Sequence, residues 1–200
     1  MLKIMIVEDH ALVRVGMANL LKQLDEDVAV TECGDAEAAM DNLDLDEDYD
    51  LLLLDLGLPE VDGFQLLDQL RMHYPMLPVV VVSAYTDEVR IGRAMRKGAL
   101  GYITKSHTSD ELLDALREVL AGNIYRPRPN SQPAESEQDF VVDESKLVEP
   151  SEFGLTERQA QVLAYMANGK SNKQIASELR ISEGTVKIHI TAIFKALNVN

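Results

Sequence analysis

The sequence has little cysteine and no long apolar stretch. Cys33 is the only cysteine among 200 residues, so a disulfide cannot form within the chain. This composition fits a reducing compartment, and we expect a cytoplasmic protein in which Cys33 is a buried structural thiol. Apolar runs fall well short of the roughly 20 residues that a membrane-spanning helix needs. The N-terminus has no signal-peptide pattern, so we expect no membrane partner.

Positive charge is also scarce, and its distribution along the chain is uneven. The net charge is −15. Residues 1–125 carry 10 basic and 24 acidic side chains, and residues 126–150 carry 3 and 6, whereas residues 151–200 carry 6 and 4. Because phosphate backbones attract basic surfaces, only residues 151–200 are compatible with nucleic-acid binding.

Short apolar runs alternate with segments of helical periodicity in residues 1–125. Uninterrupted apolar runs predict strands that are covered on both faces, as in a parallel sheet. The right-handed crossover rule then gives a flavodoxin-like, doubly wound α/β domain with five strands. The predicted strands are 1–7, 28–33, 49–54, 79–82 and 101–104, and the predicted helices are 13–24, 36–43, 64–73, 88–97 and 109–121.

Polar side chains stand where four of these apolar runs end. They are Glu8 and Asp9, then Asp55, Ser83 and Lys105. Ligands of parallel sheets bind where the strands finish, so we expect these side chains to share one crevice. Like charges packed closely repel one another, and a divalent ion between the carboxylates relieves the conflict. Oxygen ligands of this kind favour Mg²⁺.

The same residues are suited to accepting a phosphoryl group. Once a metal neutralises its acidic neighbours, the Asp55 carboxylate can attack phosphorus and form an aspartyl phosphate. Lys105 as a charge and Ser83 as a hydrogen-bond donor would then bind the phosphoryl oxygens. Taken singly, an Asp at a strand end is usually a turn former or helix cap, and a Lys there is usually a solvated charge. All five at successive strand ends favour a functional site.

These strand ends and their loops resemble the receiver domain of bacterial two-component response regulators. The resemblance rests on Glu8-Asp9, DLGLPEVDG at 55–63, Ser83-Ala84 and GALGYITK at 98–105. It implies that a sensor histidine kinase phosphorylates Asp55. It further implies that Asp9, Asp55 and the Gly57 carbonyl hold Mg²⁺, with Glu8 acting through water.

The resemblance also implies a switch in which Ser83 moves toward the phosphoryl group and Tyr102 rotates inward. From the residues alone, Tyr102 is equally an ordinary half-buried aromatic of a strand. Many receivers have a proline after the lysine, joined by a cis peptide bond. Here the residue is Ser106, and since cis bonds are rare before other residues, we do not expect one.

Residues 126–150 differ in composition from the segments on either side. They are rich in Pro, Ser, Glu and Gln, and their few apolar residues cannot bury enough surface to offset ordering. We expect a flexible linker, extended at its prolines. Phe140-Val141-Val142 is the one place where it could dock on a domain.

Residues 151–200 predict a small all-helical unit. An apolar stripe runs up to Gly169, which ends a first helix. Ser171 can cap a second helix over 172–179, and Ile181-Ser182 makes a tight turn into a third over 183–197. A helix, a short turn and a second helix form the geometry that places a helix in the DNA major groove.

This unit resembles the LuxR-type DNA-binding domain, which places the whole chain among NarL/FixJ-type regulators. The resemblance rests on LTER at 155–158, GKSNKQIA at 169–176 and ISEGTVKIH at 181–189. It implies that DNA is contacted by Ser182, Thr185 and Lys187, that Ile188 faces the groove, and that Lys173 approaches phosphate. His189 has no partner at metal-ligand spacing, so packing or a phosphate contact is the better interpretation.

Some positions depart from the LuxR-type pattern. Gln159 and Thr191 stand where relatives commonly have Glu and a basic residue, and losing a phosphate contact lowers affinity and its salt dependence. Relatives also continue into a fourth helix, which we expect to be missing after Asn200. We therefore expect the unit to lean on the receiver or on a neighbouring chain, within a homodimer joined through the receiver.

The sequence thus predicts a transcription regulator controlled by phosphorylation, and not an enzyme. An alternative is a phosphorylation-dependent protein-interaction switch that binds DNA poorly because of its short C-terminus. A phosphohydrolase with Asp55 as nucleophile would need a general acid. Phosphatases with such a nucleophile usually carry a second Asp two residues later, and Gly57 occupies that position.

Overall fold

The computed structural model of the chain describes residues 1–25, 27–46, 48–127, 155, 157–179, 181 and 183–197. Some predicted features lie outside these residues, namely the linker from 128 onward with its apolar triplet, Ser182, and the chain end from 198. Across the described parts of the chain, the helices are too short or too polar to cross a membrane.

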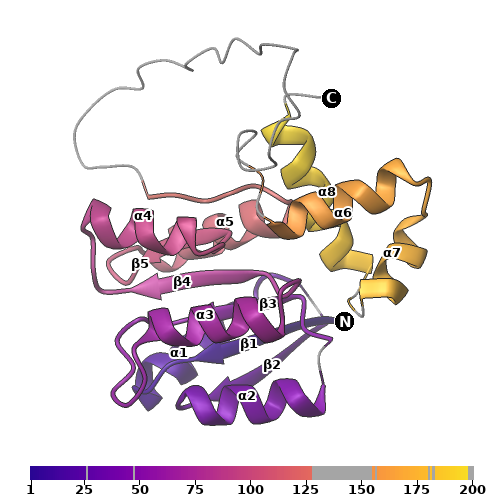
Figure 1. Cartoon of the computed structure of the whole chain (residues 1–200). Coiled ribbons are helices and arrows are strands. Elements are labelled where there is room, and N and C mark those ends of the chain that lie inside the picture. The colour runs from indigo at the N-terminus through magenta and orange to yellow at the C-terminus, as the bar shows by residue number, and fades with distance from the viewer. Residues whose placement is uncertain are drawn as a thin grey trace.

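A five-stranded parallel sheet forms the centre of the α/β unit, residues 1–127 (Figure 1). The order across the sheet is β2-β1-β3-β4-β5, which confirms the predicted doubly wound topology. Every residue of the last three strands is buried, as expected for apolar strands covered on both faces. The strands are β1 (Leu2–Val7), β2 (Val28–Cys33), β3 (Leu51–Leu54), β4 (Val79–Ser83) and β5 (Gly101–Thr104).

Helices cover both faces of this sheet and create two apolar cores. One core packs α2, α3 and α4 against one face, and the other packs α1 and α5 against the opposite face. The burial of Cys33 agrees with its predicted structural role, and burial raises the pKa of its thiol to about 11. The helices are α1 (Ala11–Leu21), α2 (Ala36–Leu45), α3 (Gly63–His73), α4 (Glu88–Arg96) and α5 (Ser109–Leu120).

Side-chain caps fix where several of these helices begin. The side chains of Asp35, Asp87 and Thr108 each accept a hydrogen bond from a backbone N–H of the first turn. Thr108 and Glu111 form a reciprocal capping box. Each such cap contributes about 1 kcal/mol to helix stability, so the loops that follow the strands have defined ends.

The C-terminal helices form the predicted helix-turn-helix arrangement. They are α6 (Glu157–Ala167), α7 (Asn172–Leu179) and α8 (Glu183–Ala196). Gly169 follows α6 in the left-handed conformation, with φ +73°. The Ser171 hydroxyl accepts from the Gln174 amide and the Gln174 side chain accepts from the Ser171 amide, so the predicted cap of α7 is present.

The C-terminal helices pack against one end of the α/β unit, which is one of the two arrangements that the sequence left open. Met76, in the loop between α3 and β4, lies in an apolar cluster with Leu155, Val162 and Ile193. In return, Ile188 of α8 is buried in the core that α1 and α5 share with the sheet. Figure 1 shows these helices at the end of the sheet where the strands begin, opposite the ends on which the polar residues lie.

Candidate phosphoryl-acceptor site

The sheet brings the predicted polar residues to one edge, because adjacent parallel strands end together. The backbone hydrogen bonds continue one residue past the strands. Asp55 N–H donates to the Val7 carbonyl at 2.9 Å, and Lys105 N–H donates to the Ser83 carbonyl at 2.8 Å. Glu8, Asp55 and Lys105 thus directly follow β1, β3 and β5, Ser83 is the last residue of β4, and all four lie at the same edge of the sheet.

Lys105 joins the two buried carboxylates of this edge. Its Nζ lies 2.7 Å from Glu8 Oε2 and 2.8 Å from Asp55 Oδ2. Glu8 is 0 % and Asp55 5 % exposed. Burial alone would lower the pKa of the Lys105 ammonium, but hydrogen bonds to Asp55 and Glu8 outweigh it and raise the pKa above its usual value. The ammonium group is therefore held charged between the two carboxylates.

Some of the residues predicted to hold Mg²⁺ lie close together at this edge. Glu8, Asp9 and His10 each place a ligand atom within 4.8 Å of the others. A Cβ built on Gly57 would lie 3.3 Å from Asp55 Oδ2, so the Gly57 backbone passes close to that carboxylate. Hard oxygens from Glu8, Asp9, Asp55 and the Gly57 carbonyl fit the preference of Mg²⁺.

Ser83 and Tyr102 lie buried beside this edge. Ser83 Oγ accepts a hydrogen bond from the Tyr85 N–H at 3.3 Å, and Tyr102 OH donates to the Tyr85 carbonyl at 2.9 Å. Burial raises the pKa of the Tyr102 phenol, although a hydrogen bond with Ser83 opposes this. Because Tyr102 is 0 % exposed, its ring already occupies an inward position in this structure.

Two neighbours of the acidic pair were not predicted from the sequence. His10 Nδ1 lies 2.8 Å from Asp9 Oδ1, and hydrogen bonds first to Asp9 and then to Glu8 raise the pKa of its imidazole. Arg14 Nη1 donates to the backbone carbonyls of Glu8 and Asp9. In the sequence alone, a basic residue one turn into an amphipathic helix looks the same as an ordinary solvent-exposed charge.

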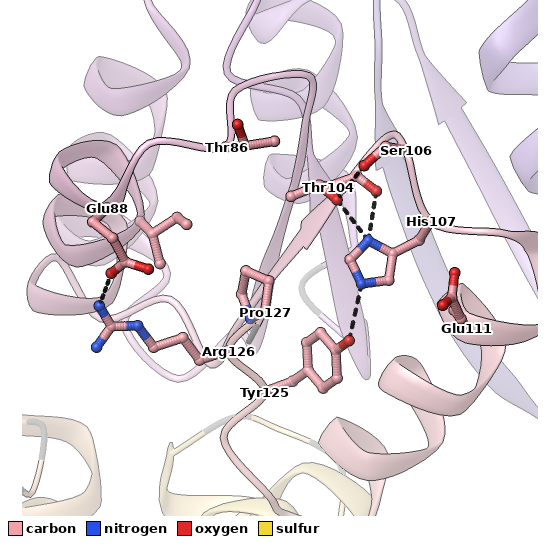
Figure 2. A pocket seen from close by; sticks show the side chains of 10 residues that line it. Thr86, Glu88, Thr104, Ser106, His107, Glu111, Tyr125, Arg126 and Pro127 are labelled. Atoms are coloured by element: carbon pink, nitrogen blue, oxygen red, sulfur yellow. Dashed lines mark hydrogen bonds and ion pairs between the residues drawn. The ribbon is translucent and has the colours of Figure 1, made fainter. Parts of the chain in front are cut away.

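A cavity of about 790 Å³ opens beside β5, between α4 and the loop before α5 (Figure 2). His107 lies in its wall, where Nδ1 is 2.6 Å from Thr104 Oγ1 and Nε2 is 3.1 Å from Tyr125 OH. Arg126 forms an ion pair with Glu88 of α4. The chain after α5 therefore lines this cavity together with the loop that follows Lys105.

The residues predicted to contact DNA differ in exposure. Lys173 and Lys187 are exposed, whereas Thr185 is buried. Ile188 is 4 % exposed and packs against the α/β unit, so in this arrangement it faces the protein. Ser182 lies outside the described residues. The structure thus exposes both lysines to solvent and buries Ile188 between α8 and the sheet.

Both parts of the chain match family models. Residues 4–117 match the response regulator receiver domain, and residues 154–200 match the luxR family of bacterial regulatory proteins. The chain is 38% identical to the glycerol metabolism activator of Pseudomonas putida, over 100% of this chain and 91% of that protein. It is 36% identical to the nitrate/nitrite response regulator protein NarP of Escherichia coli, over 98% of this chain and 89% of that protein.

Solved structures agree with these sequence matches. A LuxR family DNA-binding response regulator from Silicibacter pomeroyi superposes with a TM-score of 0.57 at 30% identity. The alignment covers 64% of this chain and 98% of that chain.

Proposed function

The chain belongs to the bacterial response regulators that join a receiver domain to a LuxR-type DNA-binding domain, and we propose that phosphorylation of Asp55 controls its binding to DNA. It is a transcriptional regulator and not an enzyme. The observation that carries the proposal is the buried cluster of Glu8, Asp55 and Lys105 at the ends of adjacent strands. The cluster offers a carboxylate that can accept a phosphoryl group and an ammonium group that can pair with its oxygens.

The chemistry follows from where these side chains lie. An Asp55 oxygen attacks phosphorus, the bond to the leaving group breaks, and the leaving group takes the electron pair with it. Lys105 then exchanges its contact with the Asp55 carboxylate for one with a phosphoryl oxygen, and the Ser83 hydroxyl donates to another. Glu8, Asp9, Asp55 and Gly57 would hold Mg²⁺, which when bound neutralises charge between the carboxylates and the incoming phosphoryl group.

A sensor histidine kinase is the phosphodonor that a receiver domain implies, and we infer that it delivers the phosphoryl group to this edge. The edge lies away from the C-terminal helices (Figure 1). A kinase docked at this edge would not cover the interface between the receiver and α8, so that interface could change after phosphorylation. We also infer Tyr102 to be a switch residue, because its hydroxyl and Ser83 both bond to Tyr85.

We infer further that the receiver restrains the DNA-binding helices before phosphorylation. The face of α8 that carries Ile188 is buried against the receiver, and His189 Nε2 lies 3.0 Å from the Met76 carbonyl oxygen. While this face of α8 packs against the receiver, the same face cannot enter a DNA groove. Release of α8 would let Lys173, Ser182, Thr185, Lys187 and Ile188 meet DNA, with residues 126–150 as tether and a homodimer as the binding form.

DNA binding by the full chain with and without a phosphoryl mimic tests this proposal. With beryllofluoride bound, Lys187→Ala should weaken DNA binding, by about 1 to 3 kcal/mol if Lys187 contacts a base. If it contacts only phosphate, the slope of log affinity against log salt should fall by about one. The measurement is fluorescence anisotropy with labelled DNA across a salt series.

Lys22→Ala is the matched control for this variant. Lys22 is an exposed lysine of the receiver, so its loss removes the same charge without changing the helix proposed to contact DNA. Equal binding by Lys187→Ala and Lys22→Ala at every salt concentration would place DNA recognition elsewhere. Binding that never responds to the mimic would favour the alternative of a protein-interaction switch.

A further inference from the structure

Arg14 connects three parts of the receiver around the acidic pair. Arg14 lies near the start of α1. Its Nη1 donates to the carbonyl of Glu8 at 2.6 Å and to that of Asp9 at 3.3 Å. Its Nε lies 3.6 Å from Glu32 Oε2 of β2. The side chain is only 19 % exposed, so these contacts are largely shielded from water.

These contacts fall where the backbone has few other restraints. The last sheet bond of this segment runs from Glu8 N–H to the Cys33 carbonyl, and the first bond of α1 runs from Arg14 N–H to the His10 carbonyl. Between them, the carbonyls of Glu8 and Asp9 accept from the Arg14 guanidinium. If these peptide planes rotated, the side chains of Glu8 and Asp9 would turn with them, because each Cβ is bonded directly to the backbone.

We propose that Arg14 is a positioning residue for the magnesium site, holding the Glu8–Asp9 peptide so that both carboxylates face the edge of the sheet that carries Asp55 and Lys105, which we call the acceptor edge. The proposal rests on the proposed function, in which Glu8 and Asp9 hold Mg²⁺. Arg14 reaches the site only through backbone carbonyls. Glu32 keeps the guanidinium in place from the side of β2, and a planar fork suits two carbonyls and a carboxylate together.

The direction in which Mg²⁺ affinity changes when Arg14 is removed shows whether Arg14 acts by positioning the ligands or only through its charge. A cation near a metal site repels the metal, so if Arg14 acted through its charge alone, removing it would tighten Mg²⁺ binding. A positioning residue has the opposite effect, since its loss frees the loop and weakens binding. Residues that orient metal ligands typically contribute about 10-fold to 100-fold in metal affinity.

Calorimetric titration of the full chain with Mg²⁺ measures this sign. We expect Arg14→Ala to bind Mg²⁺ about 10-fold to 100-fold more weakly. Arg14→Lys should also bind more weakly, because an ammonium keeps the charge but lacks the fork. Arg117→Ala, which removes an exposed arginine of α5, should bind as the parent does.

Hydrogen exchange of the metal-free protein gives a second readout. Amides at residues 8–11 should exchange faster in Arg14→Ala than in the parent, with the rest of the sheet unchanged. Equal or tighter Mg²⁺ binding by Arg14→Ala would overturn the role of Arg14. Unchanged Mg²⁺ binding by Asp9→Asn would instead overturn the magnesium site itself, and the role of Arg14 with it.

A separate set of contacts concerns the chain after α5. It turns at Gly122 and runs back along the outer edge of β5 (Figure 1). Tyr102 N–H donates to the Tyr125 carbonyl at 3.0 Å, and Tyr125 N–H donates to the Leu100 carbonyl at 3.1 Å. We call residues 124–127 the strap, since they join the edge of the sheet without being one of its strands.

The strap is anchored to both loops that follow the phosphoryl-binding residues. Arg126 pairs with Glu88, which begins α4 after the loop from Ser83. Tyr125 OH meets His107, two residues after Lys105 (Figure 2). Asp55 directly follows β3 in the middle of the sheet, and the strap lies beyond β5 on the outer side. Movement of these loops toward a phosphoryl group on Asp55 is therefore movement away from the strap.

From this arrangement we infer that phosphorylation loosens the strap and frees the start of the linker. The inference also rests on the proposed function. Loosening of the strap would affect the DNA-binding helices because the strap directly follows the turn at Gly122. That turn lies against α8, since a Cβ on Gly122 would lie 2.3 Å from Thr191 Cβ. The segment that responds to the phosphoryl group is thus continuous with the one that contacts the DNA-binding helices.

Hydrogen exchange of the full chain with Mg²⁺ and beryllofluoride tests the strap. Exchange at the Tyr102 and Tyr125 amides should rise about threefold to tenfold, the range for one net hydrogen bond. The Leu100 amide, which donates to Val79 on the other side of β5, should not change. Tyr125→Phe, which lacks the hydroxyl that meets His107, should show faster exchange at Tyr102 even without the mimic.

Fluorine NMR on the same samples reports whether the mimic is bound. Bound mimic with unchanged exchange at Tyr102 and Tyr125 would overturn the strap and leave Asp55 in place as acceptor. No bound mimic in the parent would overturn the acceptor assignment, and the strap mechanism with it.

Discussion

Replacing Asp55 with asparagine is expected to abolish phosphorylation of this protein. Asp55 is the carboxylate that meets Lys105 at the acceptor edge, and an amide oxygen is too weak a nucleophile to attack phosphorus. Incubation with a small phosphodonor and Mg²⁺, followed by intact-mass spectrometry, should show one added phosphoryl group on the parent and none on Asp55→Asn. Excess chelator should remove the label from the parent as well.

Asp110→Asn serves as the matched control, because Asp110 is an exposed carboxylate in the first turn of α5. It should accept the label as the parent does. Labelling of Asp55→Asn at the parental level would reject Asp55 as the acceptor. Labelling that persists in chelator would show instead that the acceptor is correct and that the metal requirement is wrong.

Gly122→Ala is expected to raise DNA binding by the unphosphorylated protein toward the level of the phosphorylated one. A Cβ at this position would lie 2.3 Å from Thr191 Cβ and 2.8 Å from the Ile188 carbonyl oxygen, so α8 has to move away. Gly122 also has φ +84°, and an alanine there adds about 1 kcal/mol of backbone strain. Every 1.4 kcal/mol lost by the closed arrangement favours the open one about tenfold.

Gly98→Ala separates the interdomain clash from the backbone strain. Gly98 has φ +91°, but its added Cβ would meet only the side chain of Arg71, at 3.2 Å. Both variants should lose similar thermal stability, whereas only Gly122→Ala should gain DNA affinity and show faster hydrogen exchange in α8. Equal DNA affinity in the two variants would mean that contact with α8 does not restrain DNA binding.

The acceptor edge was predictable because its physical basis is regular. Apolar runs such as residues 51–54 are buried on both faces and so mark strands of a parallel sheet. Strands in such a sheet end at a common edge, which places Asp55 beside Lys105 although 50 positions separate them. Helix bounds were predicted less closely. The helix expected from residue 13 begins at Ala11, and α2 continues to Leu45 beyond its expected end.

The sequence by itself therefore determined the doubly wound sheet, the helix-turn-helix and the group of residues at the strand ends. Each follows from a local period, a cap or a strand end, and these depend on neighbours along the chain. The tertiary structure alone decided that Ile188 packs on the receiver, that Met76 enters the core of the C-terminal helices, and that Arg14 holds the acidic loop. An apolar residue at helical spacing looks the same whether protein or DNA covers it, because burial between distant segments leaves no periodic trace in either one.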